Sequence, residues 1–410
     1  MAWYEILGII AGLVTIGSGT IWVIKRIRHT SEKSINGKDG RISIQLPPPP
    51  PGMTHAEIKL TIDYVDGLPD APPKIRDPFD EGRKLHRDNK YREAINQYES
   101  CFQAETTKSQ RAALHILIGN CFLSLSELEE AEGHYRQAEK AAKEVADREG
   151  LAAALGNIGR IYYIRGKLAE ALDYQQQALN IDMELDRKDG VASDLGNIGR
   201  IYETKGDLER ALDYHQQAFD INKEIGRKDG EATSLGRIGV IYETRGELDK
   251  SLDYHQQALD INKEIGHKEG VANQLGNIGL VYYIRGELDK ALDYLQQSLE
   301  IHREIGRREG EDAALGNIGV IYQAKGELDK ALDSHQQSLE ISKEIGHKEG
   351  VANQLGNIGV IYQTKGELDR ALEYHQQALK LFEEIGAKLE IERVERNIQE
   401  IVERTKSSRG

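Results

Sequence analysis

The sequence predicts an all-α solenoid, in which pairs of helices stack one behind the other. A short motif, Leu-Gly-x-Ile-Gly, returns every forty residues without a slip. Each forty-residue unit contains two separate helical patterns of apolar residues, and no proline follows Pro78 to interrupt them. A fixed period of this length is the signature of a repeat architecture, in which each unit contacts only its neighbours. The motif begins at Leu155, Leu195, Leu235, Leu275, Leu315 and Leu355.

Each unit is expected to contain two helices that pack closely. In one unit the first pattern covers 192–205 and the second covers 208–225. Gly206 and Gly226 follow these patterns at the position where a helix end favours a residue with positive φ. Gly199 lies inside the first helix, where glycine costs about 1 kcal/mol relative to alanine. A glycine at every equivalent position therefore indicates a close approach between helices.

The composition excludes nucleic acid as the main partner. The 410 residues carry a formal net charge of −14, whereas a duplex-binding protein needs clustered cations to displace counterions. The two cysteines, Cys101 and Cys121, have neither metal-binding nor disulfide spacing. We expect both to pack in the core.

The N-terminal residues 1–28 predict a membrane anchor. Residues 6–24 contain no charge, and at about 1.5 Å per residue a helix of this length just crosses a hydrocarbon core of about 30 Å. Lys25, Arg26 and Arg28 follow the apolar run, which places the following residues on the cytoplasmic side. We therefore predict a single-pass protein with its N-terminus outside and its repeats in the cytoplasm. A signal peptide, the alternative, would carry its positive charge before the run.

Gly8 and Gly12 form a GxxxG within this apolar run. Small residues one turn apart let two transmembrane helices approach closely, which would give a weak homodimer. The alternative is that glycine is simply frequent in such helices.

Residues 29–77 predict a juxtamembrane spacer. Five consecutive prolines, 47–51, favour a stiff polyproline II segment. This run is either a spacer or a ligand for an aromatic groove. On both sides of it, apolar and polar residues alternate over 42–46 and 58–64, which predicts a short β-hairpin.

The repeat resembles a known family, the tetratricopeptide repeat. Two looser units, around Gly82 and Gly119, precede the six exact ones, which gives eight repeats over 78–387 and a capping helix in 388–410. The forty-residue unit is similar to the subclass found in kinesin light chains and Pins-type adaptors. The resemblance implies a right-handed superhelix of helix pairs. The family's small and large positions fall on Leu195, Ile198, Gly199, Tyr202, Gly206, Leu208, Ala211 and Ala218.

The resemblance also implies where a ligand binds, because the first helices of this family line a concave peptide-binding groove. One series of groove residues is mainly asparagine, which either bonds a ligand backbone or ties adjacent repeats together. A second series changes from basic to apolar along the chain, which predicts a ligand with an acidic end and an apolar segment. The first series is Asn157, Asn197, Arg237, Asn277, Asn317 and Asn357. The second is Arg160, Arg200, Val240, Leu280, Val320 and Val360. A third series, either specificity or drift, is Tyr163, Glu203, Glu243, Tyr283, Gln323 and Gln363.

The sequence offers no catalytic, metal or cofactor site. It contains no phosphate loop, nucleophile elbow or His-Glu-x-x-His motif. Histidines recur forty residues apart, at His215, His255, His335 and His375. One histidine per repeat cannot converge on a metal, so we expect packed, hydrogen-bonded residues.

Together these observations predict a membrane-anchored, non-enzymatic scaffold that binds a protein or peptide partner in the groove of its repeats. The alternative is a peptide-sensing regulatory or signalling subunit that is coupled to the membrane.

Overall fold

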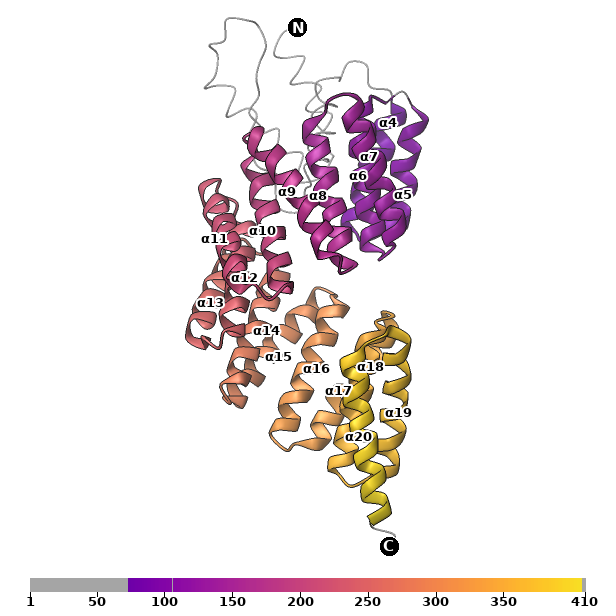
Figure 1. Cartoon of the computed structure of the whole chain (residues 1–410), viewed down its shortest axis with the longest axis vertical. Helices are drawn as coiled ribbons and strands as arrows, with labels where there is room; N and C mark the ends of the chain where they lie inside the picture. The colour runs from indigo at the N-terminus through magenta and orange to yellow at the C-terminus, as the bar shows by residue number, and fades with distance from the viewer. Residues whose placement is uncertain (1–72, 105, 408–410) are drawn as a thin grey trace, which may run out of the picture. The chain divides into compact units, whose positions relative to one another are not determined.

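The computed structural model describes residues 73–104 and 106–407. Within these ranges the chain forms seventeen α-helices and one short 3₁₀-helix, with no strand (Figure 1). From Lys108 to Lys388 a new helix begins every twenty residues, so two helices make up each forty-residue repeat. The described residues divide into two compact units, the first ending at Gly230 and the second beginning at Glu231.

The first unit contains four helix pairs. Its helices begin earlier than predicted, because α4 starts at Pro73, inside the segment 29–77 that we predicted to be a spacer. Proline is well tolerated at the first helical position, since its missing N–H has no intrahelical partner there. The bounds are α4 (Pro73–Arg87), α5 (Tyr91–Ser100), η1 (Cys101–Gln103), α6 (Lys108–Ser124), α7 (Leu128–Glu144), α8 (Arg148–Ile164), α9 (Leu168–Glu184), α10 (Lys188–Thr204) and α11 (Leu208–Glu224).

The second unit contains four further pairs and a final helix. The boundary between the units falls in the first turn of α12. The bounds are α12 (Lys228–Thr244), α13 (Leu248–Glu264), α14 (Lys268–Ile284), α15 (Leu288–Glu304), α16 (Arg308–Ala324), α17 (Leu328–Glu344), α18 (Lys348–Thr364), α19 (Leu368–Ile385) and α20 (Lys388–Ser407).

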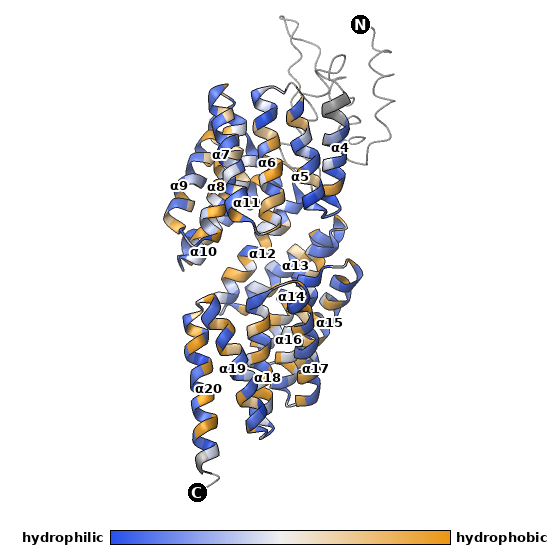
Figure 2. Cartoon of the chain, turned by 90° about the vertical axis from the view of Figure 1, so that its right-hand side faces the viewer, coloured by the Kyte–Doolittle hydropathy of each residue, from blue (hydrophilic) through white to orange (hydrophobic). Residues whose placement is uncertain are grey.

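The final helix, α20, covers the last helix pair. Its apolar residues recur as separate orange turns between blue ones in Figure 2. Val394 and Ile401 on this stripe are each only 1% exposed, and they join a core cluster with Phe382 of α19. A solenoid needs such a cap, because its last repeat would otherwise expose an open core.

The turns within the repeats end in the left-handed conformation that the glycine pattern predicts. Gly206 has φ 76° and Gly226 has φ 69°. The backbone N–H of Asp207 donates to the carbonyl of Tyr202 at 3.0 Å, so the last carbonyls of the helix are satisfied. Four earlier turns adopt the same conformation without glycine, at Asn89, Ser126, Ala146 and Asp186, whereas the turn at Gly166 has glycine.

The glycines of the first helices are required for packing, as predicted. Gly199 on α10 faces His215 on α11, and a Cβ atom at Gly199 would lie 2.7 Å from the imidazole ring. Carbon atoms do not approach this closely without displacement, so alanine would force the two helices or the ring to move. Three further repeats combine glycine and histidine in the same way, at Gly239 and His255, Gly319 and His335, and Gly359 and His375.

A second series of glycines, which we did not predict, allows close packing between repeats. A Cβ atom at Gly190 on α10 would lie 1.8 Å from the carboxylate of Asp182 on α9. Asp182 is buried at the end of its helix. The same position in later repeats pairs Gly230 with Asn222, Gly270 with Asn262, Gly310 with His302 and Gly350 with Ser342.

Several predicted features lie outside the described residues. They are the apolar segment 6–24 with Gly8 and Gly12, and the hairpin expected within 42–64. Within the described part of the chain, no helix combines the length and the apolar character that a membrane crossing needs.

Candidate functional site

In the first unit, α8 and α10 carry four of the predicted site residues at equivalent positions. Asn157 and Arg160 lie one turn apart on α8, as do Asn197 and Arg200 on α10. The two helices contact each other. The neighbouring isoleucines on both helices are buried, whereas Arg160 is exposed and the other three residues are half-buried. These four residues therefore share an open face, which we call the α8–α10 face.

The two asparagines of this face are bonded within the protein. The amide of Asn157 donates to the carbonyl of Ala153, one turn earlier, at 3.0 Å. The amide of Asn197 lies 3.5 Å from Oε1 of Gln175 on α9, which belongs to the preceding repeat. Gln175 in turn donates to the carbonyl of Gly156 at 2.8 Å. At Asn197, the contacts favour the interpretation that asparagine ties adjacent repeats together.

Arg200 is held by an aromatic ring rather than by a carboxylate. Its guanidinium carbon lies 5.1 Å from the ring centroid of Tyr163 on α8, within the range of a cation–π interaction. The hydroxyl of Tyr163 lies 3.0 Å from Oγ1 of Thr204, which fixes the ring against α10. Nε of Arg200 is buried and has no hydrogen-bond partner among the described residues. The guanidinium is therefore positioned by contacts that leave its charge uncompensated.

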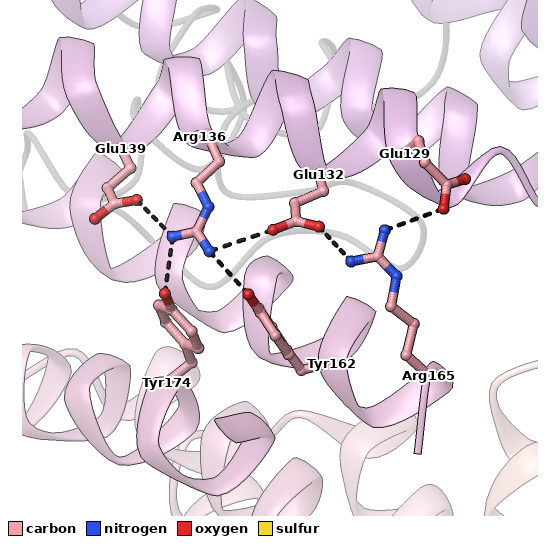
Figure 3. Close-up of polar contacts among 7 residues, drawn as sticks. All are labelled: Glu129, Glu132, Arg136, Glu139, Tyr162, Arg165 and Tyr174. Atoms are coloured by element: carbon pink, nitrogen blue, oxygen red, sulfur yellow. Dashed lines mark hydrogen bonds and ion pairs between the residues drawn. The ribbon is translucent and has the colours of Figure 1, made fainter. Parts of the chain in front are cut away.

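Other arginines of the first unit are bound to carboxylates. The guanidinium of Arg136 contacts two glutamates and the hydroxyls of Tyr162 and Tyr174, and that of Arg165 contacts two glutamates (Figure 3). Arg187 pairs with Asp182 at 3.0 Å. The glutamates in Figure 3 are Glu129, Glu132 and Glu139.

The arginines of the α8–α10 face differ from these. Arg160 donates to Oδ1 of Asn157 at 3.3 Å. Neither Arg160 nor Arg200 forms an ion pair within the described residues. The α8–α10 face thus presents two guanidinium groups without a carboxylate partner among the described residues, in a chain with a net charge of −14.

The nearest acidic residue on α10, Glu203, is engaged elsewhere. Its Oε1 lies 2.5 Å from Nε2 of His215 on α11. His215 is only 2% exposed, so the carboxylate is drawn toward the interior of the helix pair.

In the second unit, three asparagines of the predicted series have no such partners. Asn277, Asn317 and Asn357 are half-buried, and their side chains form no hydrogen bond within the described residues. An amide both donates and accepts, so each is available to a ligand backbone. Arg237 occupies the equivalent position on α12, and it is described with this unit rather than with Arg160 and Arg200.

The same unit contributes the aliphatic part of the predicted site. Val240, Leu280, Val320 and Val360 are half-buried on α12, α14, α16 and α18. The helices α14, α16 and α18 contact each other in order. We call the open side that carries Asn277, Leu280, Asn317, Val320, Asn357 and Val360 the α14–α18 face.

The recurring histidines are packed, as predicted. Nδ1 of His255 lies 2.9 Å from Oε1 of Gln274, and Nδ1 of His335 lies 2.8 Å from Oε1 of Gln354. Both glutamines belong to the next repeat, and burial lowers the pKa of both histidines. His375 differs, because neither of its ring nitrogens has a partner among the described residues. In the described part of the chain no three His, Cys, Asp or Glu residues form a group that could hold a metal.

The sequence did not predict which side chains contact the candidate site residues or their neighbours. Tyr163 and Glu203 were noted only as members of a variable series, and the contact between Glu203 and His215 was not expected. Asp194 was missed entirely. It is 6% exposed, and burial together with the nearby Asp182 raises its pKa to about 8. The sequence does contain a signal for Asp194, because other repeats have neutral residues at the equivalent position. These residues are Ser234, Gln274, Ala314 and Gln354.

The helix pairs and their open faces are typical of helical-repeat proteins that bind other proteins. A comparison with family profiles identifies the family. The family profile of the tetratricopeptide repeat matches residues 109–184, 151–224, 230–304 and 310–384. These ranges cover more than half of the chain, which therefore belongs to the tetratricopeptide repeat family. No curated protein matches the sequence.

Solved structures of similar fold include Rap proteins. The apo form of RapI has a TM-score of 0.53 at 18% identity, over 67% of this chain and 99% of that one. A Rap protein complexed with Competence and Sporulation Factor has a TM-score of 0.54 at 14% identity, over 80% and 98%. Aspartyl phosphate phosphatase F from Bacillus subtilis has a TM-score of 0.51 at 13% identity, over 81% and 94%. At these identities the likeness shows a shared fold.

Proposed function

We propose that this protein is a non-enzymatic, membrane-anchored scaffold that captures a protein or peptide partner through an acidic end of that partner. The observation that carries the proposal is the pair Arg160 and Arg200, two guanidinium groups on one face without an ion pair in the described residues. A guanidinium matches the geometry of a carboxylate. The buried Nε of Arg200 has no partner among the described residues, and leaving a buried donor unpaired is costly, so a ligand carboxylate is the group expected to complete this site.

The α14–α18 face of the second unit offers the chemistry that binds an apolar segment of a peptide. Its three amides lack side-chain hydrogen bonds among the described residues, and they alternate along the chain with Leu280, Val320 and Val360. An extended peptide presents backbone donors and acceptors together with side chains. Amides and aliphatic groups are the chemistry that such a segment requires.

The membrane part of the proposal rests on the sequence of residues 6–24 and on Lys25, Arg26 and Arg28 after it. The positive-inside rule favours a cytoplasmic repeat region. Protease added to intact cells should leave that region intact, and its digestion before lysis would contradict this orientation.

A second candidate function is a regulatory subunit that senses a peptide. It is favoured by the likeness in fold to the Rap protein complexed with Competence and Sporulation Factor. In this case the peptide would change the arrangement of the repeats, and the change would pass to the membrane segment. A short free peptide that binds and alters hydrogen exchange throughout the repeats would favour this candidate over the scaffold.

A selection of peptides tests the leading proposal. A random peptide library is displayed on phage and selected on the full-length chain in mild detergent. We expect enrichment of sequences with an acidic end, and loss of their capture by the Arg160→Glu, Arg200→Glu double variant. Charge reversal of one desolvated contact should weaken binding by at least about tenfold.

The matched control is Arg148→Glu on α8. This substitution changes the net charge as much as each single reversal does, but Arg148 pairs with Glu184 instead of facing the site. The control should capture the peptides normally. Enrichment of neutral or basic sequences, or equal loss of capture in the control, would contradict the proposal.

A further inference from the structure

The buried histidines of the second helices are hydrogen-bonded in all repeats that have one except the last. His255 and His335 each bond a glutamine nineteen residues later, on the first helix of the next repeat. His215 has no such glutamine, because Ser234 takes that position, and it bonds Glu203 instead. These three histidines are at most 2% exposed. At each of these junctions between helices, a neighbouring side chain therefore satisfies the buried imidazole.

His375, in the last repeat, is the exception. It is 0% exposed, and neither of its ring nitrogens has a hydrogen-bond partner among the described residues. Burial and the charge of Arg393 lower its pKa, so the ring is neutral and carries one N–H donor and one acceptor. A buried polar group without a partner is costly, because it has lost its bonds to water and gained none. Nineteen residues later, the position of the glutamine is taken by Val394 on α20, which is 1% exposed.

The helix α20 occupies the place that the first helix of a following repeat would take. It begins at Lys388, forty residues after α18 begins at Lys348, and it packs against α18 and α19. The two side chains that it buries fully, Val394 and Ile401, are aliphatic and join one core cluster. This helix therefore closes the apolar core, but it does not form the hydrogen bond that a glutamine forms in the preceding repeats.

We propose that α20 is a displaceable cap, and that the surface of α18 and α19 beneath it binds a partner helix that presents a side-chain amide to His375. The occupant is an amphipathic helix with a glutamine in its buried stripe, as α14 and α18 have at Gln274 and Gln354. Such a helix would replace the apolar contacts of α20 and add the missing hydrogen bond. This site lies in the second unit and uses no residue of the α8–α10 face, so it goes beyond the proposed function and does not depend on it.

The test uses two fluorescein-labelled synthetic peptides of residues 388–407, one with the native sequence and one with the Val394→Gln substitution. The affinity of each peptide for the full-length chain in mild detergent is measured by fluorescence anisotropy. Both peptides must displace the same α20, so the cost of displacement cancels in the ratio of their affinities. We expect the substituted peptide to bind about tenfold more tightly, because its amide pairs with the buried imidazole of His375.

The chain variant His375→Leu completes a double-mutant cycle with the two peptides. Leucine is the residue that the chain itself has at the equivalent position, Leu295, where it packs against Gly279. With leucine in place of the imidazole, the amide of the substituted peptide has no partner. The preference should therefore reverse in favour of the native peptide.

Hydrogen exchange of the full-length chain gives a second readout that needs no peptide. The substitution Val394→Gln gives α20 the missing amide, and it should slow the exchange of the α20 backbone amides about tenfold. The matched control is Ile401→Gln, which introduces the same amide at the other fully buried position of α20. This control should speed the exchange, because it removes an apolar contact without pairing His375.

Three results would overturn the proposal. If neither peptide binds at any concentration up to its solubility, α20 is not displaced. If the substituted peptide has no advantage, or keeps the same advantage on His375→Leu, the amide does not pair with this histidine. Faster exchange of α20 in the Val394→Gln chain than in the wild type would also contradict the pairing.

Discussion

The buried carboxyl of Asp194 makes the stability of the first unit depend on pH. Its side chain is 6% exposed, and its Oδ2 has no hydrogen-bond partner among the described residues. Burial is the main cause of its raised pKa, and Asp182 and Asp189 raise it further, whereas Arg187 lowers it. The result is a pKa of about 8 in place of the ordinary 3.8.

The sign of the effect follows from proton binding. Between pH 3.8 and about 8, the folded chain keeps a proton on Asp194 that the unfolded chain has lost. The free energy of unfolding therefore falls as the pH rises through this window, and the loss is complete above it. Because each pH unit between the two pKa values is worth about 1.4 kcal/mol, the total loss has an upper limit of about 5 to 6 kcal/mol.

The substitution Asp194→Asn removes the titrating group and should remove this dependence. Urea unfolding, followed by far-ultraviolet circular dichroism at about pH 5 and about pH 9, measures the effect. The variant should gain several kcal/mol over the wild type at the higher pH, but at most about 1 to 2 kcal/mol at the lower one. The exposed Asp173→Asn on α9 is the control. A difference between Asp194→Asn and wild type that does not change with pH would refute the reasoning.

Two further predictions concern packing and the network in Figure 3. Gly199→Ala should lower the free energy of unfolding by about 1 to 3 kcal/mol, because its Cβ would meet His215. Gly196→Ala, which meets nothing within 4 Å, should raise it by up to about 1 kcal/mol; equal effects in urea unfolding would contradict this contrast. Arg136→Gln introduces the residue that the next repeat has at the equivalent position, Gln176. It should lower the free energy of unfolding by about 1 to 3 kcal/mol, and an unchanged unfolding midpoint would argue against a structural role for the network.

The repetition in the sequence explains why the fold could be predicted so fully. Glycine occupies every such turn from Gly206 to Gly386, and it adopts a positive φ at little steric cost. Gly199 repeats inside a helix, where it is costly, so a close approach could be inferred. Gly190 repeats as regularly, but it lies in the first turn of its helix. Sequence alone does not distinguish a packing glycine from a turn residue there.

The candidate site was less accessible to sequence reasoning. The series of asparagines left two roles open and did not distinguish its members, whereas the contacts of Asn197 with Gln175 differ from those of Asn277. Which neighbour a side chain meets depends on residues in the adjoining repeat. Periodicity does not show that Arg200 stacks on Tyr163, because the two lie on different helices and share no spacing rule.

The coupling between Arg200 and a ligand carboxylate tests the central claim most directly. The affinity of the acidic peptide and of a copy with glutamine in place of its terminal glutamate is measured for the wild-type chain and for Arg200→Gln. These four values form a double-mutant cycle. A carboxylate bound by Arg200 predicts a coupling free energy of at least about 1 kcal/mol. A coupling near zero, with both changes simply additive, would show that the acidic end binds elsewhere.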